Sequence, residues 1–174
     1  MQIRPTNLRD VDRLMPLFDE ARGTIAALGI DQWQDGYPSR LVIEDDVARK
    51  RAYLVECDKK IAATFVLVDD GEITYDEIFG GRWLTGDSRG THCVYVAIHR
   101  VAVAVARRGS GISTAILDYA ATHARALGRS SLRIDTHEGN VVMRRMLEKH
   151  GFTLCGRIRL QNGAPRVAYE RVLD

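Results

Sequence analysis

Apolar residues in the first half of the chain follow a helical pattern and then a strand pattern. Between residues 8 and 28 they recur at spacings of three and four, which predicts an amphipathic helix. Pro16 falls inside this pattern and should kink or split the helix, because proline removes a backbone donor. The other elements expected here are a strand at 2–5, a loop at 30–38, a helix from its cap Ser39 to about Arg49, and hairpin strands at 52–57 and 61–68.

The second half begins with residues 69–91, which are rich in Gly, Asp and Thr and predict a long irregular loop. A β-branched strand at 93–105 then runs through a glycine-rich turn into an amphipathic helix at 109–127. A strand at 131–136 should lie parallel to the one at 93–105, because a helix connects the two. The remaining elements are a helix at 140–150 and a hairpin of strands at 152–160 and 166–172.

Composition limits the domain count and the partners. The chain has 174 residues, of which 45% are hydrophobic, and this suits one compact domain with a sizeable core. No repeat, low-complexity segment or linker divides the sequence, so we expect a single domain at 1–174. The 25 basic and 23 acidic residues leave a formal charge of +2. The basic residues are scattered along the chain, which gives no reason to expect nucleic acid as a partner.

Hydropathy and cysteine usage bear on the compartment. No apolar stretch approaches the roughly 20 residues that a membrane span requires, and the N-terminus lacks the apolar core of a secretory signal. Cys57, Cys93 and Cys155 are far apart and lack ligand spacing, which predicts reduced thiols and no metal site. We therefore expect a cytoplasmic protein with no metal and no membrane partner. The sequence leaves open whether the chain forms a homodimer.

The segment Val101–Leu127 carries the strongest chemical signal, because a strand meets a helix at a glycine-rich turn. Backbone N–H groups at such a helix start form an anion site, and Arg107 and Arg108 add positive charge beside them. A nucleotide P-loop is excluded, since no Lys follows Gly111. A dinucleotide-binding turn fits less well, because Thr114 stands where its third glycine belongs, although Asp135 ends the next strand.

The spacing Arg108-x-x-Gly111-x-Ser113 resembles the phosphate-binding loop of the GCN5-related N-acetyltransferases. The stretch from Asn140 to Gly151-Phe152 is similar to a second motif of that family, and the resemblance covers essentially the whole chain. It implies an α/β (α+β) fold with a mixed, mostly antiparallel sheet of about seven strands and about four helices. Its two central parallel strands should pair at one end and splay at the other.

The resemblance also implies the cosubstrate, acetyl coenzyme A, and the residues that bind it. The opened backbone of the strand at 93–105 would hydrogen-bond the pantetheine arm, and the loop would hold the pyrophosphate. Ser113 departs from the Gly or Ala that is usual in the family. The cofactor-binding residues implied in this way are Val101, Ala102, Val103, Arg108, Gly109, Ser110, Gly111, Ile112, Ser113 and Asn140.

The amine that is acetylated must lose a proton, so a base is needed. Alternation along the strand places five side chains on one face: Tyr95, Ala97, His99, Val101 and Val103. Arg100 should lie on the opposite face. Relatives often carry a Glu on this strand; here His99 is the candidate base, since an unperturbed imidazole titrates near neutrality. A hydrogen-bonded structural role for His99 is the alternative.

Two further positions bear on chemistry and specificity. The family's helix commonly carries a Tyr that protonates the leaving thiolate, and Leu147 occupies the matching position here. Aromatic residues in the loops, Trp33, Tyr37 and Trp83, are candidates for contacts with the acceptor.

These features predict an acetyl-CoA-dependent N-acetyltransferase that transfers directly to the primary amine of a small or amino-acid-like molecule. A non-catalytic acyl-CoA-binding or regulatory module is the alternative, favoured by the absence of that Tyr. A nucleotide-dependent oxidoreductase is a more distant third. The identity of the acceptor, and whether the acyl group is acetyl or longer, stay open at this point.

Overall fold

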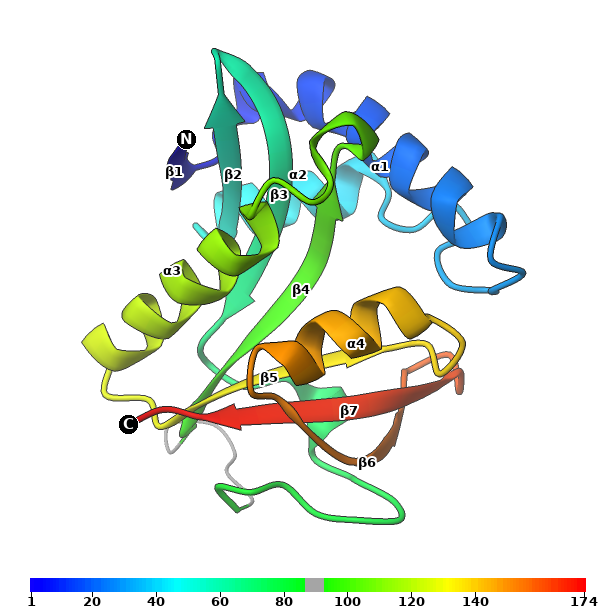
Figure 1. Ribbon diagram of the computed structural model, residues 1–174, viewed down its shortest axis with the longest axis vertical. Helices are drawn as coiled ribbons and strands as arrows, with labels where there is room; N and C mark the ends of the chain where they lie inside the picture. Colours follow the sequence, from blue (N-terminus) through cyan, green and yellow to red (C-terminus); the bar gives the residue numbers. More distant parts are fainter. Residues whose placement is uncertain (87–92) are drawn as a thin grey trace. The chain divides into compact units, whose positions relative to one another are not determined.

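The computed structural model describes residues 1–86 and 93–174 (Figure 1). Its helices are α1 (Val11–Ala26), α2 (Arg40–Ala48), α3 (Ile112–Ala126) and α4 (Val141–Lys149). Its strands are β1 (Gln2–Pro5), β2 (Ala52–Cys57), β3 (Lys60–Val68), β4 (Tyr95–Val103), β5 (Ser131–Thr136), β6 (Thr153–Arg159) and β7 (Pro165–Val172). Across the described residues the strands form a seven-stranded sheet in the order β1-β2-β3-β4-β5-β7-β6. The mixed sheet with four helices confirms the predicted fold class.

The chain divides into two compact units. The first contains Met1–Leu67 and His99–Ile116, and the second contains Val68–Ile98 and Leu117–Asp174. Strand β4 and helix α3 contribute residues to both units. The expectation of a single domain at 1–174 stays a prediction, because two compact units are compatible with one domain.

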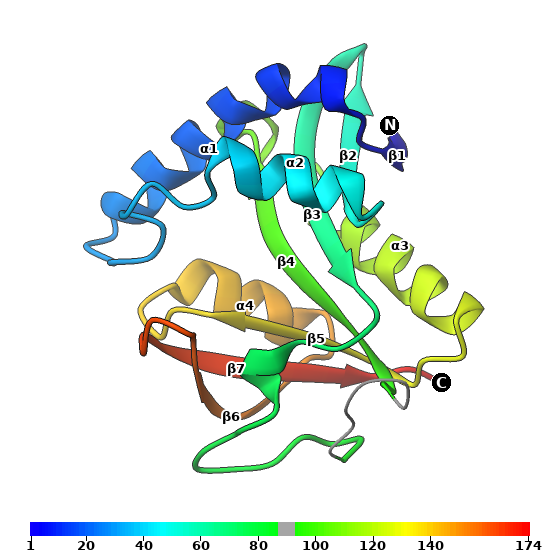
Figure 2. The same cartoon turned by 180° about the vertical axis from the view of Figure 1, so that it is seen from behind.

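The first unit packs α1 and α2 against β2 and the end of β4, as Figure 2 shows for the helices over β2 and β3. Strands β1, β2 and β3 pair antiparallel. The shared apolar core consists of Val11, Leu14, Leu17, Phe18 and Ala21 from α1, Ile43 from α2, Leu54 from β2 and Ala102 from β4. Ser39 caps α2 as predicted, because its hydroxyl accepts from the Val42 amide.

Helix α1 shows where the sequence pattern was too simple. Asn7 and Asp10 form a capping box around a short 3₁₀ turn, Leu8–Asp10, and α1 then runs without interruption past Pro16. The helix is therefore not split, and a kink at Pro16 stays a prediction. A proline inside a helix costs about 3 kcal/mol, whereas each large apolar side chain that α1 buries contributes about 1.5–3 kcal/mol. Pro16 also lies on the exposed face of the helix, where water can satisfy the carbonyl that it leaves unpaired.

The second unit is built on β5, β7 and β6, which pair antiparallel in that order, with α4 lying along them in Figure 1. Strand β4 pairs parallel with β5 at Tyr95–Ala97, as predicted for strands joined by a helix, and continues beyond this pairing to Val103. Leu147 of α4 is fully buried. No helix among the described residues is long and apolar enough to cross a membrane.

The predicted loop at 69–91 is partly ordered by contacts with β6. A 3₁₀ turn at Ile73–Tyr75 is followed by an antiparallel bridge in which Phe79 and Arg157 exchange backbone hydrogen bonds of 2.8 and 2.9 Å. The Arg82 amide donates to the Cys155 carbonyl at 3.0 Å. The rest of this predicted loop, at 87–92, lies outside the described residues.

Replacing Gly81 with alanine should destabilise the protein, because the bridge brings two backbones into contact at this residue. A Cβ atom on Gly81 would lie 1.9 Å from the Cys155 carbonyl oxygen, a distance that only a backbone shift can relieve. We expect a loss of about 1–3 kcal/mol in the free energy of unfolding, measured by urea denaturation. Gly23→Ala is the control, since Gly23 lies in helix α1 without a left-handed φ and a Cβ there meets nothing within 4 Å; a loss at Gly23 as large as the loss at Gly81 would contradict the close approach.

Candidate functional site

The predicted phosphate-binding loop lies in the first unit, between β4 and α3. A 3₁₀ turn at Val105–Arg107 leads into Arg108–Gly111, which are exposed, and α3 begins at Ile112. Gly109 and Gly111 adopt φ values of 76° and 81°, in the left-handed region that glycine enters without steric cost. Two glycines therefore give the loop the path that the sequence pattern predicted.

Three residues from other elements hold this loop. Glu20 of α1 accepts from the Val105 amide at 2.9 Å, and the Thr24 hydroxyl accepts from Arg108 Nη2 at 3.0 Å. Arg107 forms a 2.8 Å ion pair with Asp58 in the β2–β3 turn. Thr24 is a neutral partner, so the hydrogen bond fixes Arg108 without cancelling its charge. Sequence reasoning missed these supports, because nothing in the local pattern links α1 to a loop eighty residues later.

The loop has room for an anionic group. A Cβ built on Gly111 meets nothing within 4 Å. The first hydrogen bond of α3 runs from the Ala115 amide to the Gly111 carbonyl, so the helix itself does not use the amides of its first turn. The exposed residues Arg108–Gly111, the open space at Gly111 and the Arg108 guanidinium suit a pyrophosphate. Among the described residues, no group of His, Cys, Asp and Glu could hold a metal ion.

The strand residues assigned to the cofactor arm differ in burial. Val101 and Val103 are half-buried, whereas Ala102 is 2% exposed and packs into the core with α1 and α2. Ala102 is therefore a core residue, so the predicted contact with the cofactor would have to come from its backbone. The pairing of β4 with β5 covers Tyr95–Ala97, which precedes all three of these residues.

The conformation of Arg100 makes the backbone of β4 irregular. Arg100 has a φ of 51°, a left-handed conformation that a non-glycine residue rarely adopts inside a strand. Its side chain pairs with Asp46 of α2, and Ala102 packs in the cluster that contains Ile43 of the same helix, as alternation predicts for two residues on one face. The left-handed residue forms a local kink in the strand.

Asp46, Arg100 and Tyr37 form a buried polar network in the first unit. Arg100 Nε and Nη2 lie 2.7 Å from the two carboxylate oxygens of Asp46, and Nη1 donates to the Tyr37 hydroxyl. The side chains of Asp46 and Arg100 are 5% and 14% exposed. Burial raises the pKa of Asp46, and the Arg100 guanidinium opposes this rise.

Two sequence signals could have revealed this pair. Asp46 lies three residues after Ile43 and one before Val47, on the apolar face of α2, where a carboxylate requires a basic partner. Arg100 is a charged residue inside an otherwise apolar strand.

The loop before α2 carries two of the predicted acceptor-binding residues. Trp33 packs edge-on against Phe18 of the core, with ring centroids 6.1 Å apart, and lies 6.3 Å from the Tyr37 ring. Arg22 of α1 donates to the carbonyls of Tyr37 and Pro38, and these hydrogen bonds attach the loop to α1. The first unit thus brings Trp33 and Tyr37 together with Arg100, and helix α1 contacts both this loop and the predicted phosphate-binding loop.

Trp83 and Asn140 belong to the second unit. Trp83 is 3% exposed; its indole N–H donates to the Tyr75 carbonyl and its ring lies 4.2 Å from the Arg133 guanidinium. These contacts are those of a core residue. The Asn140 side chain caps α4 by accepting from the Met143 amide at 3.2 Å. The structure therefore assigns each of them a packing or capping contact, and their binding roles stay predictions.

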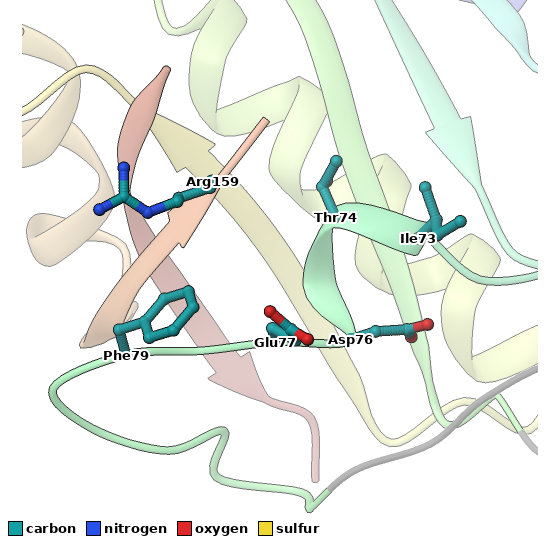
Figure 3. A pocket seen from close by; sticks show the side chains of 6 residues that line it. All are labelled: Ile73, Thr74, Asp76, Glu77, Phe79 and Arg159. Carbon is teal, nitrogen blue, oxygen red and sulfur yellow. The ribbon is translucent and has the colours of Figure 1, made fainter. Parts of the chain in front are cut away.

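The second unit also contains a pocket of about 260 Å³ between the segment 73–79 and Arg159 at the end of β6 (Figure 3). It is lined by Ile73, Thr74, Asp76, Glu77, Phe79 and Arg159. None of the residues predicted from the sequence lines it.

Comparisons with known proteins agree with the fold described above. The model of the acetyltransferase (GNAT) family matches residues 24–152. A GNAT-family acetyltransferase of Streptococcus agalactiae is 35% identical over 99% of this chain and 95% of its own, with a TM-score of 0.84. No curated protein matches the sequence.

Two more distant structures share the fold. A GNAT-family acetyltransferase of Listeria monocytogenes is 19% identical over 99% of this chain and 94% of its own, with a TM-score of 0.72. The PaiA N-acetyltransferase of Thermoplasma acidophilum, solved in complex with coenzyme A, is 14% identical over 98% of both chains, with a TM-score of 0.72.

The fold is that of the GNAT acetyltransferases, a family that uses acetyl-CoA. Because the family model spans most of the sequence, this chain belongs to the GNAT acetyltransferase family.

Proposed function

We propose that the protein transfers an acetyl group from acetyl-CoA to the primary amine of a small acceptor, directly and in a ternary complex. The observation that carries the proposal is the exposed glycine-rich start of α3, with open space at Gly111 and Arg108 beside it. Membership of the GNAT family supports the cosubstrate and the acyl transfer. The nature of the acceptor and the residue roles are our inference.

The phosphate-binding loop, Arg108–Ser113, supplies amides and charge for the pyrophosphate. The backbone of Val101–Val103 supplies strand-like hydrogen bonds for the pantetheine arm. Holding the thioester beside an amine makes the transfer effectively intramolecular, which can contribute several orders of magnitude in rate.

His99 acts as the base in this proposal. It accepts the proton that the amine loses as its nitrogen bonds to the acetyl carbon; the carbon–sulfur bond breaks, and coenzyme A leaves as the thiol. Leu147 is fully buried and has no titratable group, so the proton for sulfur comes from solvent or from another residue.

Trp33 and Tyr37 are the proposed acceptor contacts. They lie in a loop that α1 fixes, and Tyr37 reaches the Arg100 side chain. A rigid aromatic rim of this kind suits a small organic amine.

Ligand binding and turnover test the proposal separately. In a thermal-shift experiment, coenzyme A and acetyl-CoA should raise the melting temperature, whereas NAD should not. Release of coenzyme A is then measured with a panel of aliphatic, aromatic and amino-acid-like amines. Stabilisation without release for any amine would favour the non-catalytic acyl-CoA-binding module, for which the replacement of the family's Tyr by Leu147 is the specific observation. Stabilisation by NAD alone would favour the oxidoreductase.

Replacing Gly111 with valine should weaken coenzyme A binding by about 30-fold or more, because a branched side chain would occupy the open space beside the amides. The substitution also places a β-branched residue at a φ of 81°, so some loss of stability is expected.

Gly128→Val is the matched control for this variant. Gly128 ends the same helix with a φ of 68°, and a Cβ there also meets nothing within 4 Å. It should show a similar loss of stability with unchanged affinity for coenzyme A, measured by calorimetry. If Gly111→Val binds coenzyme A within threefold of the parent, the loop does not hold the pyrophosphate.

A further inference from the structure

Arg100 combines a strained backbone with a side chain that contacts two other residues. Its φ of 51° lies inside strand β4, where the residues around it are extended. A non-glycine residue keeps such a conformation only when its surroundings determine it. Here the guanidinium is fixed on two sides, by both carboxylate oxygens of Asp46 and by the Tyr37 hydroxyl.

Asp46 holds the Arg100 side chain in this arrangement. Its side chain is 5% exposed and lies on the apolar face of α2, where an isolated carboxylate would be costly. The bidentate contact with Arg100 compensates its charge. The exposed ion pair between Asp12 and Arg40 joins α1 to α2 in the same unit, but both of its side chains are about half or more exposed. Of these two ion pairs, the Asp46–Arg100 pair is the one that involves β4, the strand that carries His99.

The kink in β4 lies between the proposed base and the residues proposed to bind the cofactor arm. His99 immediately precedes Arg100, and Val101–Val103 immediately follow it. In a regular strand successive side chains alternate, so returning Arg100 to an extended conformation would turn His99 relative to the residues that follow. The conformation of Arg100 therefore fixes the proposed base relative to the proposed backbone contacts of the cofactor arm.

Tyr37 links the same guanidinium to the acceptor rim. Its hydroxyl accepts a hydrogen bond from Arg100 Nη1, and its ring lies next to Trp33. One side chain thus connects the base-bearing strand, helix α2 and the loop proposed to contact the acceptor.

We propose that Asp46 and Arg100 are positioning residues for acetyl transfer, which hold the kink in β4 and dock Tyr37, so that His99 and the acceptor meet in one geometry. This inference rests on the proposed function and deepens it, because it names the residues that align base and acceptor. Neither side chain is proposed to touch the reacting atoms.

The test uses the paired variant Asp46→Asn/Arg100→Gln, which removes both charges together and leaves no buried charge uncompensated. Coenzyme A affinity, kcat and the KM for the best amine are measured, together with the melting temperature. We expect kcat/KM for the amine to fall by about 10²-fold, since a small misplacement of reacting groups has an effect of this size. Coenzyme A affinity should stay within threefold, because the phosphate-binding loop is held by Glu20, Thr24 and Asp58.

Asp12→Asn/Arg40→Gln is the matched control, since it removes an ion pair between helices of the same unit without touching β4. Its kinetic constants should equal those of the parent. If the paired variant at Asp46 and Arg100 does not fold, Tyr37→Phe tests the same network by removing one hydroxyl. It should fold and lower kcat/KM for the amine by about tenfold, the effect of losing a hydrogen bond to a charged group.

The outcomes separate this inference from the proposed function. If the parent acetylates no amine in the panel, the proposed function fails and the positioning roles fail with it. If the parent is active and the paired variant, or Tyr37→Phe where the paired variant is unfolded, keeps kcat/KM within threefold, the proposed function stands and the positioning roles are overturned. An equal loss of coenzyme A affinity and kcat/KM would also overturn them, since it would indicate a general disruption of the unit.

Discussion

Replacing His99 with glutamine is expected to lower kcat by about 10²–10⁴-fold, the range typical of a lost general base. His99 is half-buried on β4, lies next to the kink at Arg100, and interacts electrostatically with the Asp46 carboxylate. Glutamine keeps the approximate size and polarity of the imidazole but cannot accept the proton. Because the phosphate-binding loop is separate from this residue, coenzyme A affinity should change little. Steady-state kinetics with the best amine and calorimetry with coenzyme A provide the measurement.

His123→Gln is the control for this variant. His123 lies on α3, is 26% exposed and has its Nε2 atom 3.7 Å from Asp69, so its replacement should leave kcat unchanged. The acidic limb of the rate–pH profile should disappear in His99→Gln and persist in His123→Gln. A His99 variant that retains the parent's kcat and acidic limb would show that His99 has a structural role only.

Replacing Arg133 with methionine should destabilise the protein by about 3–5 kcal/mol, because it leaves the buried charge of Glu170 without its partner. Arg133 and Glu170 are directly opposite each other on β5 and β7, and their side chains are 1% and 0% exposed. The guanidinium lies between Trp83 and Tyr95, 4.2 and 4.1 Å from the ring centroids. Urea denaturation followed by circular dichroism measures the loss.

The environment of Glu170 explains why its charge persists. Burial raises the pKa of this carboxyl, but hydrogen bonds from Ser131, Thr85 and Arg133 outweigh burial and hold it below its usual range. The paired variant Arg133→Met/Glu170→Met removes both charges and should recover much of the lost stability. Arg157→Met is the surface control: Arg157 and Glu138 are both 60% exposed, so the loss should stay below about 1 kcal/mol. Equal losses for Arg133→Met and Arg157→Met would contradict the argument.

Local patterns in the sequence predicted the elements of this fold well. The hairpin at 52–57 and 61–68, the helix capped by Ser39 and the glycine-rich start of α3 each depend on residues close in sequence, and the structure has all three. The path of the loop at 108–113 was predictable for the same reason, since its glycines and its helix are adjacent. A split at Pro16 does not occur, because the apolar side chains that α1 buries offset the cost of the proline, and a linear pattern does not weigh these two effects.

The polar networks could not be derived from local pattern alone. Asp46 and Arg100 come from α2 and β4, and Arg133 and Glu170 from β5 and β7, so each partner becomes visible only when the strands are placed. The left-handed conformation of Arg100 was equally out of reach, because no glycine or asparagine marks it. A charged residue inside an apolar strand was the available signal, and it recurs at both sites.

The bridge between Phe79 and Arg157 has a consequence for solubility. Strand β6 is the last strand of the sheet, and an unprotected edge strand offers its backbone groups to other chains. The segment Phe79–Arg82 occupies part of this edge through hydrogen bonds to Arg157 and Cys155. The segment therefore covers backbone groups of β6 that could otherwise pair with a strand of another molecule. Variants that loosen this segment would be expected to aggregate on heating at temperatures where the rest of the protein is still folded.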